Sequence, residues 1–196
     1  METPKYYSIE ELLSLVNEPN GSACRRLLAE NRPLFQTVQG STHNHQAWPG
    51  GYQDHVQEIM NIAHQLYFML KRLRPLPFSL SSTLLVVFLH DIEKPWKYEI
   101  GEDGQLKHRP EFGAKSDDHA FRLEKLAAGG ITLMAEELTA LTYVEGEFSN
   151  YSNRERRMNE LGAVCHSADV LSARLWHAHP LSVRDPWEGA SRIRDT

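Results

Sequence analysis

The strongest periodic pattern in the chain is an apolar stripe that begins just after Gly51. Its members recur at helical spacing: Val56, Ile59, Met60, Ala63, Tyr67 and Leu70. Residues spaced in this way lie on one face of a helix. The pattern therefore predicts a long amphipathic helix that ends before Pro75.

A second segment, from Leu84 to Leu89, is apolar at every position. A helix that is hydrophobic all round belongs in the centre of a protein, so we expect a buried helix that starts within residues 79–82. A buried strand would show the same run, because periodicity does not separate the two over so short a stretch.

The remaining elements carry weaker patterns. Ser8 and Glu11 have the spacing of a capping box, which opens a short helix through Val16. Further helices are expected at 23–30, 116–128, 133–142 and 154 to about 177, and a β-hairpin at 98–108 with Asp-Gly at its turn. Residues 33–51 are polar and contain Pro and Gly, so we expect a loop, and 180–196 are expected to form an extended tail.

These patterns predict an all-α fold, a compact helical bundle in a single domain that spans 1–196. We expect N-terminal helices over 1–40, a core over 42–178 and the tail at 180–196. No apolar run approaches the roughly 20 residues that a membrane-spanning helix needs, and the N-terminus lacks the pattern of a secretion signal. With only two cysteines, we expect a cytoplasmic protein without disulfides and without a membrane partner.

The charge balance bears on the kind of ligand. The chain has 26 acidic and 21 basic side chains, a net charge of −5. This balance disfavours nonspecific binding of long nucleic acids and leaves small ligands as the better expectation. Basic clusters at 25–26, 71–74 and 154–157 could form a phosphate-attracting rim, although each alone is explained more simply as a solvated helix face.

The pair His90-Asp91 directly follows the most hydrophobic segment and is the first candidate for chemistry. A carboxylate at the end of a buried helix is costly to desolvate unless a cation or strong donors neutralise it. A metal ion would serve. The alternative is that Asp91 caps the helix or forms an ion pair with Lys94 or Lys97.

Two further residues point to the same centre. His55 lies in register with Ile59 and Ile62 and should therefore point inward, and Asp169 shares a helix face with small side chains such as Ser172. Two imidazoles and two carboxylates from three helices suit a divalent ion such as Mn²⁺, Fe²⁺, Co²⁺, Ni²⁺ or Mg²⁺. Zinc fits less well, because its sites favour fewer ligands and thiolates.

The order of these residues resembles the His…His-Asp…Asp signature of the HD superfamily of metal-dependent phosphohydrolases. The segment 45–55 is also similar to the His-His-Ala-Tyr-Pro-Gly-Gly stretch before the first metal histidine of bacterial HD-type 3′-to-5′ exoribonucleases. The resemblance rests on three strings: His45-Gln46-Ala47-Trp48-Pro49-Gly50-Gly51-Tyr52-Gln53-Asp54-His55, Leu89-His90-Asp91-Ile92-Glu93-Lys94 and Cys165-His166-Ser167-Ala168-Asp169. It spans about residues 42–173 and implies an HD-domain helical bundle that hydrolyses phosphate esters or anhydrides with a central metal.

Two departures from the family pattern concern the number of metals. Glu93 stands where relatives usually have Gly. Relatives with two metals supply two further histidines, of which His119 matches the first, whereas the second falls at Glu145 in the string Val144-Glu145-Gly146. The resemblance thus implies one ion, with a second only if His119 ligates and Glu145 acts as an oxygen ligand.

Several residues are candidates for contacts with substrate. Lys94 could bind a phosphate oxygen, and His45 could contact phosphate or donate a proton. Trp48 and Trp96 could stack a base, and Arg122 is a weaker candidate for a second phosphate contact. Structural roles compete with each: a surface ion pair for Lys94, loop capping for His45 and packing for the tryptophans.

The sequence therefore favours a hydrolase that acts on a nucleotide or another small phosphorylated molecule through metal-activated water, with Asp91, Lys94 and His45 in catalysis. One alternative is 3′-to-5′ exonuclease action on short single-stranded RNA, as the similarity of 45–55 suggests. Another is a nucleotide-sensing module with reduced turnover, as Glu93 suggests. Homo-oligomers are common and remain open for this chain.

Overall fold

The computed structural model of the chain describes residues 4–100, 106–110, 112, 115–178 and 185–190. The elements follow one another as α1 (Ile9–Leu13), α2 (Asn20–Glu30), α3 (Arg32–Thr37), α4 (Gly51–Leu73), α5 (Leu80–Leu89), α6 (Lys94–Lys97), β1 (Tyr98–Ile100), β2 (Leu106–His108), α7 (Lys115–Gly129), α8 (Ala135–Tyr143), a 3₁₀ turn (Phe148–Asn150) and α9 (Glu160–Leu175). The all-α bundle and the antiparallel pairing of β1 with β2 are both as expected, with Tyr98 opposite His108, whereas the expected Asp-Gly turn lies outside the described residues.

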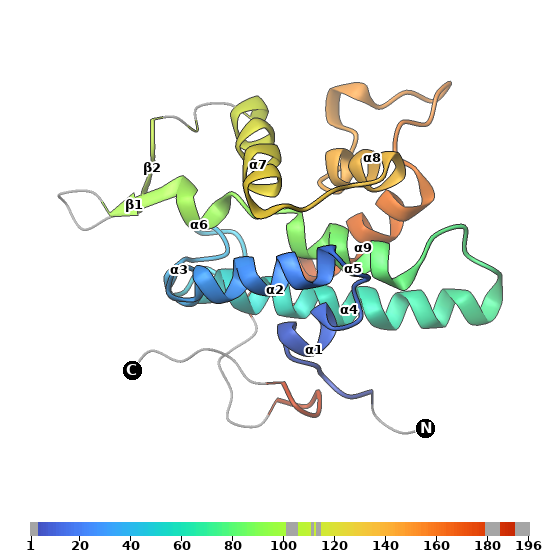
Figure 1. Ribbon diagram of the computed structural model, residues 1–196, viewed down its shortest axis with the longest axis horizontal. Helices are drawn as coiled ribbons and strands as arrows, with labels where there is room; N and C mark the ends of the chain where they lie inside the picture. Colours follow the sequence, from blue (N-terminus) through green and yellow to red (C-terminus); the bar gives the residue numbers. More distant parts are fainter. Residues whose placement is uncertain (1–3, 101–105, 111, 113–114, 179–184, 191–196) are drawn as a thin grey trace.

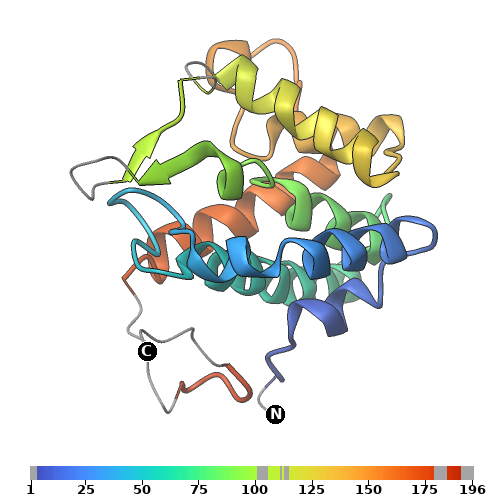
Figure 2. The same cartoon turned by 60° about the vertical axis from the view of Figure 1, so that its left-hand side comes forward.

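The core of the bundle consists of α4, α5 and α9, which pack against one another. Helix α2 lies in front of α4 in the view and contacts α1, α3 and α7, while α7 and α8 lie at the top and α1 lies at the bottom (Figure 1). The same arrangement is visible after rotation, with α9 crossing between α4 and the pair α7 and α8 (Figure 2). Three helices from distant parts of the sequence therefore meet in one interior.

The two strongest sequence patterns are confirmed. Helix α4 covers the long stripe, and Val56, Ile59 and Met60 are fully buried. The apolar run belongs to a helix and not a strand, since α5 begins at Leu80 behind its N-cap Ser79, whose side chain accepts a hydrogen bond from the Ser82 amide. The capping box of Ser8 and Glu11 is also present at α1.

Two expectations were wrong. Residues 33–51 are not one loop, because α3 occupies 32–37. Pro33 supplies a residue suited to the first turn of a helix, and Phe35 is buried against Tyr52 and Phe88. The last helix starts at Glu160 and not near 154, because the Asn159 side chain accepts the hydrogen bond of the Gly162 amide and so fixes the N-terminus.

The end of the chain packs on its beginning. Within the described part of the tail, Trp187 contacts Tyr6 edge-on at 4.9 Å between ring centroids and lies 6.1 Å from Trp176. The backbone amide of Tyr6 donates to the carbonyl of Glu188. The other expected tail residues, 180–184 and 191–196, lie outside the described residues. No helix in the described ranges has both the length and the apolar character needed to cross a membrane.

Candidate metal centre

Three helices bring two imidazoles and a carboxylate together at the centre of the bundle. His55 lies in the second turn of α4, His90 caps the C-terminus of α5, and Asp169 lies in α9. One ligand atom of each residue lies within 4.8 Å of the others. The Oδ1 atom of Asp169 is 3.4 Å from Nε2 of His55 and 4.0 Å from Nε2 of His90. The residues that the sequence pattern assigned to one site are thus neighbours.

Asp91 lies at the edge of this group. Its Oδ2 atom is 3.0 Å from Nε2 of His90 and 3.9 Å from Nε2 of His55. The same oxygen accepts from the ammonium group of Lys94 at 2.6 Å. Asp91 therefore faces both the imidazoles and a lysine, so the ion pair considered as an alternative exists beside the possible metal contact.

The Nδ1 contacts of both histidines leave Nε2 as the atom that faces the aspartates. Nδ1 of His90 lies 2.7 Å from the carbonyl oxygen of Val87, to which it donates. Both Nε2 atoms are buried, and neither has a hydrogen bond of acceptable geometry in the described structure. A buried ring nitrogen without a hydrogen-bond partner is costly, whereas a cation between the two Nε2 atoms and the two aspartates would give both nitrogens a partner. The donor set fits a divalent ion.

The orientation of His55 depends on a hydrogen-bond chain that sequence reasoning missed. Oγ of Ser172 lies 3.1 Å from Nδ1 of His55 and donates to Oε2 of Glu58 at 2.7 Å. Because the hydroxyl gives its hydrogen to Glu58, it accepts the Nδ1 hydrogen of His55 and directs Nε2 toward Asp169. Glu58 is 1% exposed and follows His55 by one turn of α4. In the sequence, a carboxylate one turn after His55 within an apolar helix face was the feature that could have indicated a buried partner for this histidine.

This chain of hydrogen bonds predicts an effect on metal affinity without a change in any ligand. Replacing Ser172 with alanine should weaken Mn²⁺ binding by roughly 10–100-fold, the range for lost partners of metal-binding histidines. Titration calorimetry measures the Mn²⁺ affinity of the variant. Ser167→Ala is the matched control, since that exposed serine of α9 bonds only to the Ala163 carbonyl among the described residues. Equal affinities for the two variants would show that Ser172 does not orient His55.

The segment between α3 and α4 folds over the candidate centre and is fixed there by Gln46. Its side-chain nitrogen lies 3.3 Å from Oε2 of Glu58 and from Oγ of Ser172, and its backbone amide donates to His177. Gln46 has a positive φ of 42°. Its carbonyl oxygen is so close to Gly51 that any Cβ at that position would overlap it. Gly50 adopts a φ of 77° at the N-cap.

Gln46 also places His45 beside the centre. Nδ1 of His45 lies 2.8 Å from Oε1 of Gln46, and the His45 ring lies 4.6 Å from the His55 ring between centroids. Burial is the main cause that lowers the pKa of His45 to about 4, with His55 and Lys94 adding to it. The imidazole is therefore neutral near pH 7. Lys94 further ties this segment to the site by donating to the carbonyl of Gly40 at 2.7 Å.

The charges in the centre set the protonation of its members. Burial opposes ionisation of Asp91, but His90 and Lys94 outweigh it and hold the pKa of Asp91 well below its ordinary value. Burial likewise lowers the pKa of His90, yet the carboxylate of Asp91 prevails and raises it to about 9. For His55 burial dominates and lowers the pKa. In the metal-free protein near pH 7, His55 is thus neutral, whereas His90 is protonated on both ring nitrogens and positively charged.

Metal binding should therefore release a proton from His90. Below a pKa of about 9 the proton competes with the metal, so we expect Mn²⁺ affinity to rise with pH up to that value and then to level off. Calorimetric titrations between about pH 6 and 9, in two buffers of different ionisation enthalpy, measure both the affinity and the proton release. Affinity that is constant over this range would contradict the expected competition.

None of the remaining candidates belongs to the group of His55, His90 and Asp169. Arg122 is buried and bonds to Glu93 and Glu145. His119 is half-buried on α7 and is not a member of the three-residue centre. Other contacts are as follows: Nε1 of Trp48 donates to Asp54, Trp96 lies beside Phe121 and under the ammonium group of Lys125, and Nδ1 of His166 bonds to the Val144 carbonyl.

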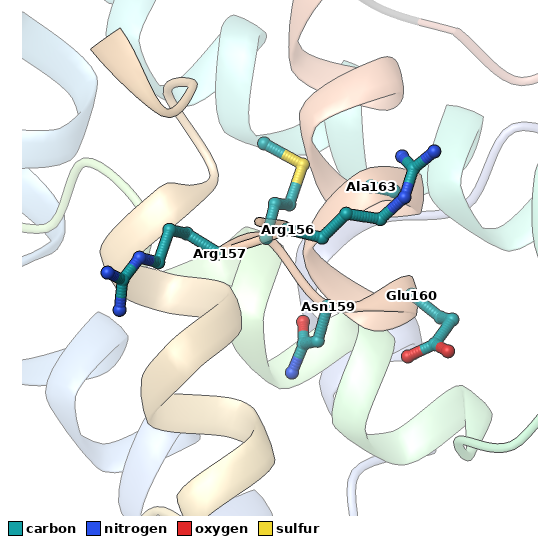
Figure 3. A pocket seen from close by; sticks show the side chains of 6 residues that line it. Arg156, Arg157, Asn159, Glu160 and Ala163 are labelled. Carbon is teal, nitrogen blue, oxygen red and sulfur yellow. The ribbon is translucent and has the colours of Figure 1, made fainter. Parts of the chain in front are cut away.

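A surface hollow of about 530 Å³ lies at the N-terminal end of α9, remote from Asp169 along that helix. Figure 3 shows the two arginine side chains, Arg156 and Arg157, pointing away from each other around it. The lining residues are Arg156, Arg157, Met158, Asn159, Glu160 and Ala163. None of them belongs to the candidate centre.

Comparisons of the chain with protein-family models, with curated proteins and with solved structures found no match.

Proposed function

We propose that this chain is a metal-dependent phosphohydrolase of the HD type that acts on a nucleotide or another small phosphorylated molecule. One observation carries the proposal: the Nε2 atoms of His55 and His90 are buried without hydrogen bonds in the described structure and face two aspartates. The resemblance of the sequence to the His…His-Asp…Asp signature names the chemistry. The net charge of −5 favours a small substrate over a long polynucleotide.

His55, His90, Asp91 and Asp169 would hold the ion. A divalent ion supplies a water of lowered pKa and offsets negative charge on a phosphoryl group. Oδ2 of Asp91 contacts both His90 and Lys94. It therefore holds the Lys94 ammonium group beside the site, at a distance of 2.6 Å. In that position Lys94 is able to bind a nonbridging phosphate oxygen when it releases the carbonyl of Gly40.

His45 is the candidate for proton transfer. Its ring lies against His55, and because Nδ1 bonds to Gln46, Nε2 is the atom left to face a ligand. A pKa of about 4 keeps the imidazole neutral at pH 7 but makes it a weak base. Because Nδ1 donates to Gln46, Nε2 carries the lone pair, so we assign it a hydrogen bond that it accepts from the attacking water and that orients this water for proton transfer.

The alternative is a nucleotide-sensing module that binds metal and turns over slowly or not at all. It is favoured by the ion pair between Asp91 and Lys94, which occupies two residues that turnover would use. Exonuclease action on short RNA is the second catalytic possibility and depends on the similarity of residues 45–55 alone.

The test uses full-length protein purified without chelator. Elemental analysis gives its metal content, and release of phosphate or nucleoside is measured with Mn²⁺ on nucleoside mono- and diphosphates, cyclic nucleotides and a short single-stranded RNA. We expect turnover of a small substrate that stops with EDTA and returns with Mn²⁺. Bound metal without turnover of any substrate would favour the sensing module, preferred turnover of RNA the exonuclease, and absence of metal would refute all three.

A further inference from the structure

A buried group of three charges lies next to the candidate metal centre. Nε of Arg122 donates to Oε2 of Glu93 at 3.1 Å, and a terminal nitrogen of the same guanidinium donates to Oε1 of Glu145 at 3.2 Å. The side chains of Arg122 and Glu93 are 4% and 3% exposed, whereas that of Glu145 is 37% exposed. One guanidinium on α7 thus joins carboxylates that precede α6 and follow α8.

The group is close to the metal centre along the chain and feels the charge of Asp91. Glu93 follows Asp91 by two residues, and the charge of Asp91 acts on both Glu93 and Arg122. His119 lies one turn before Arg122 on α7 and responds to the charges of Arg122 and Glu145. Two carboxylates therefore bond to the guanidinium, and the imidazole of His119 lies one turn away on the same helix.

These are the residues that a second metal would need. Glu93, Glu145 and His119 would provide two oxygens and a nitrogen, a donor set that divalent ions accept. In this structure, however, both carboxylates already bond to a cation that does not lose its proton. An incoming divalent ion would have to displace a buried guanidinium and leave it without its partners. The residues present do not fit a second metal.

We propose that this chain binds one divalent ion and that the guanidinium of Arg122 occupies the place of a second. Arg122 acts as a fixed positive charge that balances Glu93 and Glu145. Because its side chain is 4% exposed, it is a positioning residue that does not touch the substrate. The presence of the first ion rests on the proposed function, whereas the exclusion of another rests on the Arg122 contacts alone.

The experiment counts bound ions and asks whether they are neighbours. Full-length protein is equilibrated with Mn²⁺, passed through gel filtration and analysed for metal, and electron paramagnetic resonance distinguishes an isolated Mn²⁺ from an exchange-coupled pair. We expect the natural protein to hold about one equivalent with the spectrum of an isolated ion. Arg122→Ala, which frees both carboxylates, should take up a second equivalent and show coupling.

Two matched variants control this result. Arg122→Lys keeps a positive charge and should remain near one equivalent, and the triple variant Arg122→Ala/Glu93→Gln/Glu145→Gln should return to one because the oxygen ligands have lost their charge. If Arg122→Ala does not fold, the number of Mn²⁺ ions bound by the natural protein and by Arg122→Lys decides whether the centre holds one ion or two.

Two coupled ions in the natural protein would overturn this inference and leave the proposed function intact. A folded Arg122→Ala protein that still holds one isolated ion would show that Arg122 does not exclude the second. Absence of metal from the natural protein would refute the proposed function together with the single-ion centre.

Discussion

Replacing Asp169 with asparagine is expected to lower Mn²⁺ affinity by more than about 100-fold and to abolish metal-dependent turnover. Losing a residue that binds the metal should lower the affinity by more than losing a residue that only supports a metal-binding histidine, for which the loss is about 10–100-fold. Asp169 lies between both imidazoles, with Oδ1 3.4 Å and 4.0 Å from their Nε2 atoms. Asp91 shares its charge with Lys94, but no lysine or arginine forms an ion pair with Asp169 within the described ranges. Asp169 thus contributes most of the uncompensated negative charge.

Asparagine has nearly the same shape as aspartate, so this variant removes charge with little change of packing. Calorimetric titration with Mn²⁺ and thermal unfolding with and without Mn²⁺ measure the loss of binding. Glu160→Gln is the matched control, because it removes a charge from the exposed start of the same helix. If Asp169→Asn bound Mn²⁺ as tightly as Glu160→Gln, Asp169 would not be a metal ligand.

Replacing Arg122 with methionine is expected to destabilise the metal-free protein by about 3–5 kcal/mol, the cost of breaking a buried ion pair and leaving one charge behind. Glu93 is the group left behind, because its side chain is 3% exposed and no water can replace the guanidinium without local opening. Glu145 is 37% exposed and can be solvated. Urea unfolding in EDTA measures the effect without interference from metal.

The double variant Arg122→Met/Glu93→Gln separates charge from packing. We expect it to recover a substantial part of the lost stability, because the glutamine has no charge to desolvate. Leu123→Ala on the same helix is a control for the loss of a partly exposed side chain, since Leu123 is 37% exposed. If the single and double variants were equally unstable, the loss would come from packing of the Arg122 stem and not from an unpartnered Glu93.

Much of the fold follows from local patterns. The stripe of α4 is long enough to define a helix and its buried face, and it is confirmed. The shorter run of α5 was sufficient to predict burial, and the structure shows that it belongs to a helix. The register of His55 with that apolar stripe is sufficient to predict that its side chain points inward, and His55 is fully buried. Two short extended segments were sufficient to predict the pairing of β1 with β2, while the expected Asp-Gly turn lies outside the described residues.

The remaining features depend on contacts between distant segments. Helix α3 has one buried residue, Phe35, whose partners come from α4 and α5, so its own sequence carries little signal. The pairing of Arg122 with Glu93 and Glu145 joins three elements, and neither periodicity nor spacing indicates which acid an arginine meets. For the same reason Gln46 and Ser172 are recognisable as supports of His55 only in three dimensions.

The close approach of Gln46 to Gly51 has a consequence for how substitutions would be tolerated. A methyl group at position 51 meets the backbone of Gln46, the residue whose side chain supports both His45 and Ser172. Gly51→Ala would therefore disturb the candidate centre through a residue that has no side-chain functional group. A saturation-mutagenesis screen that selects for the proposed activity should score this glycine as intolerant as the proposed metal ligands.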